Sequence, residues 1–130
     1  MAGKIVADTL EHSTAGSVDT QYVVNGSAKA WIDIPDGQAS INDSLNVSSL
    51  DDDASGDGGI NLTASFSSAN YAIAVAAEDK SSSTTIRNHD FTNGTKTSSG
   101  YDFETFYVNA STNRTNNDLQ SFSTMFGDLA

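Results

Sequence analysis

Apolar and polar residues alternate with a period of two along several segments of the chain, and this alternation constrains the fold more than any other feature. In GINLTASF (59–66), the apolar positions are Ile60, Leu62, Ala64 and Phe66. Such a pattern places every second side chain on the same face of a β-strand. No stretch of useful length has the 3.6-residue spacing of an amphipathic helix. The sequence therefore predicts an all-β fold.

Two further segments alternate in the same way. In INDSLNVSS (41–49), Ile41, Leu45 and Val47 are predicted to share one face. In NYAIAVAAE (70–78), larger side chains alternate with alanines, so both faces of this strand are apolar. Further strands are expected near 20–25, 28–34, 101–110 and 118–126. Several short strands with Gly, Asn and Asp turns between them are typical of an antiparallel β-sandwich.

We place this sandwich domain, or knob, at residues 20–130, and we expect residues 1–19 to form an extended N-terminal arm. The apolar residues Ile5, Val6 and Leu10 lie in the arm, and STAGSV follows as a joint. An extended arm of this kind is well placed to pair with a neighbouring chain. Ile5, Val6 and Leu10 are therefore candidates for anchoring the arm to a partner.

The charge of the chain excludes several classes of partner. It has 17 acidic and 6 basic side chains, and its formal net charge is −11. Nucleic-acid binding requires a cationic face, and the six Lys and Arg residues are scattered. Neither a nucleic acid nor an anionic membrane surface is expected as a partner. There is no cysteine for a disulfide or a thiolate metal site, and no apolar run long enough to span a membrane.

The stretch DDDASGDGG (51–59) raises the question of a calcium site. If Asp51 is the first position of an EF-hand loop, the twelfth position is Leu62 in place of the required glutamate. A solvated hairpin turn is therefore favoured, although binding of a cation stays open. His12 and His89 lack the context of a zinc site or a hydrolytic triad, and we interpret both as loop or surface residues. We predict no catalytic residue, no metal site, no cofactor and no enzymatic activity.

Trp31 alternates with Ala30 and Ile32, so it lies on the opposite face of its strand. Tryptophan is enriched at subunit interfaces, and a small chain with two apolar strand faces gains from burying one of them against another copy. The alternatives for Trp31 are a packed aromatic of the core or sheet edge and a residue that stacks on a sugar, and Phe122 and Phe126 leave the same choice open. These three aromatic residues are the candidates for a subunit interface.

The segment 79–100 is long, polar and weakly patterned, so we expect an exposed loop. Recognition residues are common on such loops. Arg87, His89 and Phe91 are therefore candidates for contact with a receptor.

Several sequence segments together resemble a β-rich module that is common in tailed phages of marine and freshwater bacteria. The segments are VNGSAKAW (24–31), SLNVSSL (44–50), GINLT (59–63) and ANYAIAV (69–75), and FSTMFGD (122–128) resembles the closing strand of the module. The resemblance covers about residues 4–78 and, more loosely, residues 101–128.

This resemblance implies a homotrimeric β-sandwich or knob that is part of the virion and is not an enzyme. Such modules form either the distal part of a tail fibre or a protein that decorates the head. Only a short arm precedes VNGSAKAW, which favours a capsid decoration or cement protein on the head surface, bound to the major capsid protein. The alternative is the receptor-binding tip of a tail fibre, with tail proteins and a host surface glycan as partners.

Overall fold

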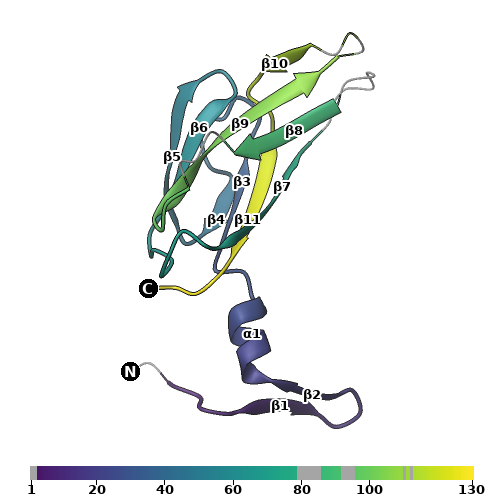
Figure 1. Cartoon of the computed structure of the whole chain (residues 1–130), viewed down its shortest axis with the longest axis vertical. Helices are drawn as coiled ribbons and strands as arrows, with labels where there is room; N and C mark the ends of the chain where they lie inside the picture. Colours follow the sequence, from purple (N-terminus) through teal and green to yellow (C-terminus); the bar gives the residue numbers. More distant parts are fainter. Residues whose placement is uncertain (1–2, 79–85, 92–95, 110, 112) are drawn as a thin grey trace.

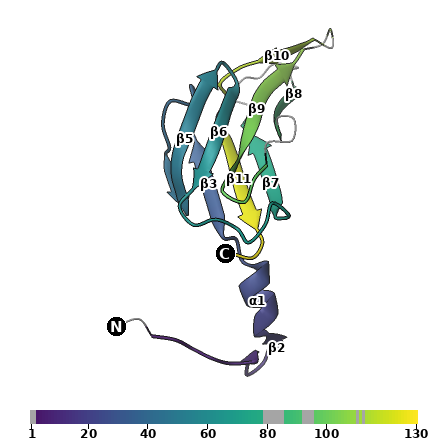
Figure 2. The same ribbon diagram turned by 60° about the vertical axis from the view of Figure 1, so that its left-hand side comes forward.

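The computed structural model describes residues 3–78, 86–91, 96–109, 111 and 113–130, and it consists mainly of two antiparallel β-sheets packed against each other (Figures 1 and 2). The prediction of an all-β fold with a sandwich-like arrangement is therefore confirmed. The regular elements are β1 (Thr9–His12), β2 (Gly16–Asp19), α1 (Thr20–Gly26), β3 (Ala30–Ile34), β4 (Asp43–Leu45), β5 (Val47–Ala54), β6 (Asp57–Leu62), β7 (Ala72–Ala77), β8 (Ile86–Phe91), β9 (Gly100–Val108), β10 (Arg114–Asn116) and β11 (Ser121–Phe126).

The first large sheet has the strand order β4-β3-β11-β7, and every neighbouring pair in it is antiparallel. The second has the order β10-β9-β6-β5, and β8 also pairs with β9. Strands close in sequence are therefore divided between the sheets: β4 belongs to the first and β5 to the second. This division sets which side chains share an outer face.

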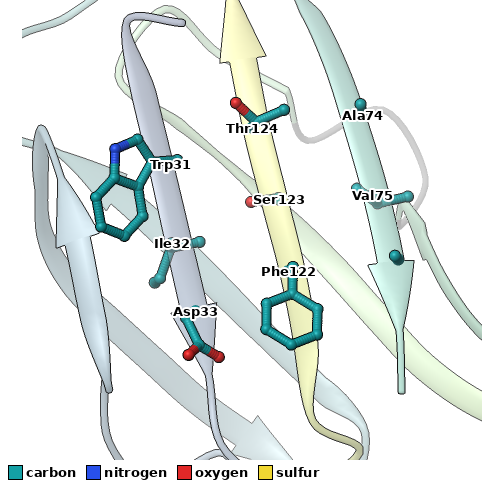
Figure 3. Close-up of a pocket in the computed structure, with 9 residues that line it drawn as sticks. Trp31, Ile32, Asp33, Ala74, Val75, Phe122, Ser123 and Thr124 are labelled. Atoms are coloured by element: carbon teal, nitrogen blue, oxygen red, sulfur yellow. The ribbon is translucent and has the colours of Figure 1, made fainter. Parts of the chain in front are cut away.

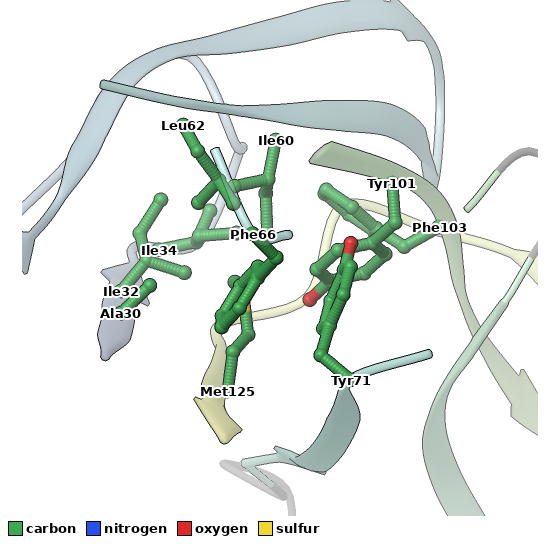
Figure 4. Close-up of a cluster of buried hydrophobic side chains, with 10 residues drawn as sticks. All are labelled: Ala30, Ile32, Ile34, Ile60, Leu62, Phe66, Tyr71, Tyr101, Phe103 and Met125. Atoms are coloured by element: carbon green, nitrogen blue, oxygen red, sulfur yellow. The ribbon is translucent and has the colours of Figure 1, made fainter. Parts of the chain in front are cut away.

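The core lies between the two sheets, where the alternating side chains of both meet (Figure 4). In β3, Ala30, Ile32 and Ile34 are buried, as the alternation predicts. The other buried members of the cluster are Ile60, Leu62, Phe66, Tyr71, Tyr101, Phe103 and Met125. Each large side chain that is fully buried contributes roughly 1.5–3 kcal/mol through the hydrophobic effect, so this cluster is the main source of stability.

The DDDASGDGG stretch forms a β-hairpin, as predicted, but its loop is much shorter than nine residues. Strands β5 and β6 pair up to Ala54 and Asp57, which leaves Ser55 and Gly56 as the connection. A register shift between Asp52 and Ala54 marks a bulge in β5. All four aspartates of the stretch therefore belong to the strands.

The predicted common face of Ile41, Leu45 and Val47 is wrong for Leu45. Asn46 has a positive φ of 57°, and at this point the chain passes from β4 in one sheet to β5 in the other. Val47 packs against the core, whereas Leu45 is 47% exposed. A left-handed residue breaks the alternation because the strands on its two sides turn different faces to the core.

The expected strand near 20–25 is also wrong, because Thr20–Gly26 form the short helix α1. Before it, β1 and β2 form a two-stranded hairpin, with Thr9 opposite Asp19. The hairpin and α1 lie beyond one end of the sandwich (Figure 1). Residues 3–8 precede the hairpin and belong to no strand or helix.

The expected loop at 79–100 contains a strand. Residues Ile86–Phe91 form β8, which pairs along its whole length with β9. Residues 79–85 and 92–95 lie outside the described part of the chain. The prediction of one long exposed loop is therefore wrong for β8.

Candidate interaction surface

The outer faces of the two large sheets differ in chemistry. On the second sheet, Asp57 lies opposite Glu104 and Gly59 lies between Asp51 and Asp102, so carboxylates gather on this face. Partial burial, and then the negative charges of Glu104, Asp53 and Asp102, raise the pKa of Asp57. This face is therefore acidic.

Arg114 in β10 contacts this acidic face. Its guanidinium forms an ion pair with Glu104 and lies over the ring of Phe106, 3.8 Å from the ring centre. Both partners of the ion pair are partly exposed, so the pair contributes little net stability.

The outer face of the first sheet is mostly apolar. Residues opposite each other in an antiparallel pair project to the same side, so the register defines two rows across this face. One row is Leu45, Trp31, Thr124 and Ala74, and the next is Asp43, Asp33, Phe122 and Ala76. The inward positions that alternate with them, such as Ile32, Ser123 and Met125, are buried.

These rows enclose a shallow groove of about 460 Å³ (Figure 3). Ala74 and Ala76 leave a low floor on β7, because their side chains are small. Trp31 and Phe122 stand higher on β3 and β11 and project from the sheet. Such a groove fits an apolar side chain of a partner better than it fits a polar ligand.

One polar group in the groove lacks a full set of partners. Asp33 Oδ1 is buried and accepts no hydrogen bond, and Asp33 Oδ2 accepts only a long hydrogen bond of 3.3 Å from Asn42 Nδ2. Asp33 as a whole is half-buried, and a carboxylate oxygen that has lost contact with water is stabilised by a donor, above all by a cationic one. The groove therefore combines an apolar floor with one carboxylate that can accept a further hydrogen bond.

The three aromatic interface candidates all project from this face. Trp31 and Phe122 line the groove, and Phe122 is 39% exposed. Phe126 lies opposite Ala72, is half-buried and does not line the groove. The sequence thus identified the aromatic residues of this surface as interface candidates but did not identify Asp33. The reason is that the pairing of β3 with β11 is not visible in the sequence of either strand alone.

The second apolar surface is at the N-terminal end. Ile5 is 91% exposed, Val6 81% and Leu10 47%. With Val23 and Val24 of α1, they line a second shallow hollow of about 440 Å³. The helix has no buried residue, and Thr20 at its start donates hydrogen bonds to the carbonyl oxygens of Ala7 and Asp8.

This surface is large for a chain of this size. Eleven large hydrophobic residues of the described chain are exposed, and seven of them precede residue 25: Ile5, Val6, Leu10, Val18, Tyr22, Val23 and Val24. An apolar surface gathered in this way is typical of a binding surface.

The interpretation of His89 as a surface residue is wrong. His89 is 2% exposed, and its ring stacks on Phe103 with 4.7 Å between the ring centres. Burial lowers its pKa to about 4, and the negative charge of Asp90 opposes this shift. Among the described residues, no group forms a hydrogen bond with either ring nitrogen. His89 therefore occupies a position in the interior and is not available to a receptor.

The two other receptor candidates also belong to β8. Arg87 is half-buried opposite Tyr107, and Ile86 at the start of the strand is 71% exposed. Phe91 ends the strand opposite Phe103, and its side chain lies outside the described part of the chain. The structure therefore brings these candidates together on a strand and not on a loop.

Within the described residues, no three His, Asp or Glu side chains are grouped so that they could hold a metal ion. His12, the last residue of β1, accepts a hydrogen bond from the backbone N–H of Ala15. No helix in the described part is long and apolar enough to cross a membrane. Searches of protein-family models, curated proteins and solved structures found no match to this chain.

Proposed function

We propose that this chain is a non-enzymatic structural protein of a tailed-phage particle, and that it decorates the capsid as a cement protein. The observation that carries the proposal is the contrast between the two outer faces, one acidic and the other apolar with an open groove. A decoration protein needs such a division, because it must bury one face against the particle or its sister copies and keep another in water. The resemblance of VNGSAKAW, SLNVSSL and GINLT to phage modules supports the assignment to a virion.

The apolar face of the first sheet is the proposed contact between copies, which assemble as a homotrimer. Trp31 and Phe122 form its centre, and Phe126 lies toward its edge. A specific interface buries roughly 800 Å² on each partner, and a few central aromatic residues carry most of the binding energy. The net charge of −11 opposes assembly, so the acidic faces must point away from one another.

The N-terminal surface is the proposed anchor to the capsid or to a neighbouring copy. Ile5, Val6 and Leu10 are too exposed to stabilise a single copy, so their burial gives free energy only on association. On the particle, the main partner is the major capsid protein. Contacts of this kind add buried area across the shell and require no chemistry.

The competing proposal is the receptor-binding tip of a tail fibre. Its contacts were expected from Arg87, His89 and Phe91, and the burial of His89 removes one of them. Arg87 and the exposed Ile86 are the described residues of β8 that a receptor would meet. No feature of the structure favours this assignment over decoration of the head.

The experiment that tests the proposal is the copy number of the chain in purified particles, measured against the major capsid protein by quantitative mass spectrometry. A decoration protein is present at a number of the same order as the capsid protein. A ratio far below this would support the tail-fibre tip, and absence from the particles would refute both assignments.

A further inference from the structure

The groove on the first sheet and the segment before β1 are each incomplete in a single copy. The groove has an apolar floor and an Asp33 carboxylate with one oxygen that accepts no hydrogen bond. The segment carries two of the most exposed apolar side chains, Ile5 and Val6. Burying one surface against the other would remove both from water.

Charge makes the two surfaces complementary. Lys29, Lys96 and Arg114 contact acceptors within their own chain, and Arg87 also has a partner. Among the cationic side chains in the described part of the chain, only Lys4 has none. Lys4 directly precedes the apolar pair, and Asp33 directly adjoins the apolar floor of the groove.

The spacing of the two surfaces also agrees. In an extended segment, Lys4 and Val6 project to the same side and lie about 7 Å apart. Across the sheet, Asp33, Phe122 and Ala76 form one row, with neighbouring strands about 5 Å apart. A segment that crosses the strands therefore brings Val6 between Phe122 and Ala76 when Lys4 is at Asp33.

We propose that the segment before β1 of one copy, residues 4–8, binds in the groove of a second copy. The Lys4 ammonium donates to the Asp33 carboxylate, and Val6 packs on Ala76 beside Phe122. Ile5 projects to the other side of the segment. This inference rests on the proposed function, since it names the partner of the apolar face, and it assigns the N-terminal anchor to a sister copy in place of the capsid protein.

The arrangement is head-to-tail, because the segment and the groove are different surfaces of the chain. In the structure the segment lies beyond α1, away from the first sheet, whose outer face carries the groove (Figure 1). Head-to-tail contacts produce a closed ring when the rotation between successive copies closes, and a closed ring of three copies is the proposed homotrimer.

Sedimentation velocity of the full chain and of charge variants tests the pairing. Lys4→Glu and Asp33→Lys are each expected to weaken association at least tenfold, because each places like charges together. The double variant Lys4→Glu/Asp33→Lys restores the attraction and is expected to recover most of the loss. Asp52→Lys, on β5 of the other sheet, is the matched control, since it changes the net charge as Asp33→Lys does.

A second comparison tests the direction of the side chains. Val6→Asp is expected to abolish association, whereas Ile5→Asp weakens it far less, although the chemical change is nearly the same. Equal effects of the two variants would overturn the assigned direction. Circular dichroism of each variant confirms that the sandwich is folded.

The outcomes separate this inference from the proposed function. Association that persists in Lys4→Glu and Asp33→Lys, or a double variant as weak as the singles, overturns the pairing. So does a wild-type chain that stays monomeric at all concentrations. The copy number in particles is a separate measurement, and a number of the same order as the capsid protein would uphold the proposed function in each of these cases.

Discussion

The β5–β6 turn offers a sharp test of the packing, because Gly56 has a left-handed backbone and lies against two other segments. Its φ is +71°, and a Cβ added there would be 2.3 Å from the carbonyl oxygen of Thr105 and 2.5 Å from the backbone nitrogen of Asn117. Both are backbone atoms, which cannot move away as the end of a flexible side chain can. The Gly56 carbonyl also accepts a hydrogen bond of 2.7 Å from the N–H of Thr105.

We expect Gly56→Ala to lower the free energy of unfolding by about 3 kcal/mol or more. The left-handed conformation costs alanine roughly 1–2 kcal/mol, and forcing a methyl group into a packed site costs typically 1–3 kcal/mol more. Gly37 provides the matched control, because its φ is +83° but nothing lies within 4 Å of an added Cβ. Gly37→Ala should therefore cost only about 1–2 kcal/mol, the backbone term alone.

The assay is equilibrium unfolding in urea, followed by the fluorescence of Trp31, which is the only tryptophan of the chain. Both variants should keep the wild-type dependence on urea and differ in midpoint. If Gly56→Ala were no more destabilising than Gly37→Ala, the turn would not be packed against β9 as described, and the reasoning would fail.

Three further predictions follow from the burial of particular side chains and from the position of the aspartates. The pKa of His89 is about 4 in the folded chain and 6.5 in the unfolded chain, so only the unfolded state binds a proton between these pH values. The free energy of unfolding should therefore fall by roughly 3 kcal/mol between pH 6.5 and pH 4 because of His89 alone. Urea unfolding across this range should show that this part of the fall is absent in His89→Phe. Ile34→Ala should lower the free energy of unfolding by about 2–5 kcal/mol, because Ile34 is fully buried. Phe122→Ala should change the unfolding free energy of the isolated chain by about 1 kcal/mol or less and weaken mainly the association of copies. Thermal unfolding measures the first effect, and sedimentation measures the second. Calcium titrated into the chain should give no tight binding by calorimetry, because no three acidic side chains of the described residues, Asp51, Asp52 and Asp53 included, are grouped so that they could hold a metal ion. A dissociation constant in the micromolar range would contradict this.

The sequence predicted the strands whose faces differ clearly in polarity. Residues of β3 and β7 alternate between buried or half-buried and more exposed positions, and the alternation is visible in AWIDI and AIAVAA. Thr20–Gly26 could not be recognised as a helix, because α1 buries no residue and therefore has no apolar stripe. Leu45 was misplaced because the left-handed Asn46 interrupts an alternation that looks continuous in the sequence.

The candidate site was predictable only in part, for a different reason. Trp31, Phe122 and the small alanines are recognisable by residue type and strand parity. That they form one groove with Asp33 depends on the order β3-β11-β7, which joins segments about fifty and ninety residues apart. His89 was misplaced because residues 79–100 were expected to form an exposed loop, whereas Ile86–Phe91 form a strand in which His89 takes an inward position.

In the proposed homotrimer, the chain buries its apolar surfaces against other copies of itself. Native mass spectrometry of the full chain over a range of concentrations therefore tests this burial, because it measures how many copies associate. We expect a species of three times the 13.6 kDa chain mass that becomes dominant as the concentration rises. A mass of one chain at every concentration would contradict it.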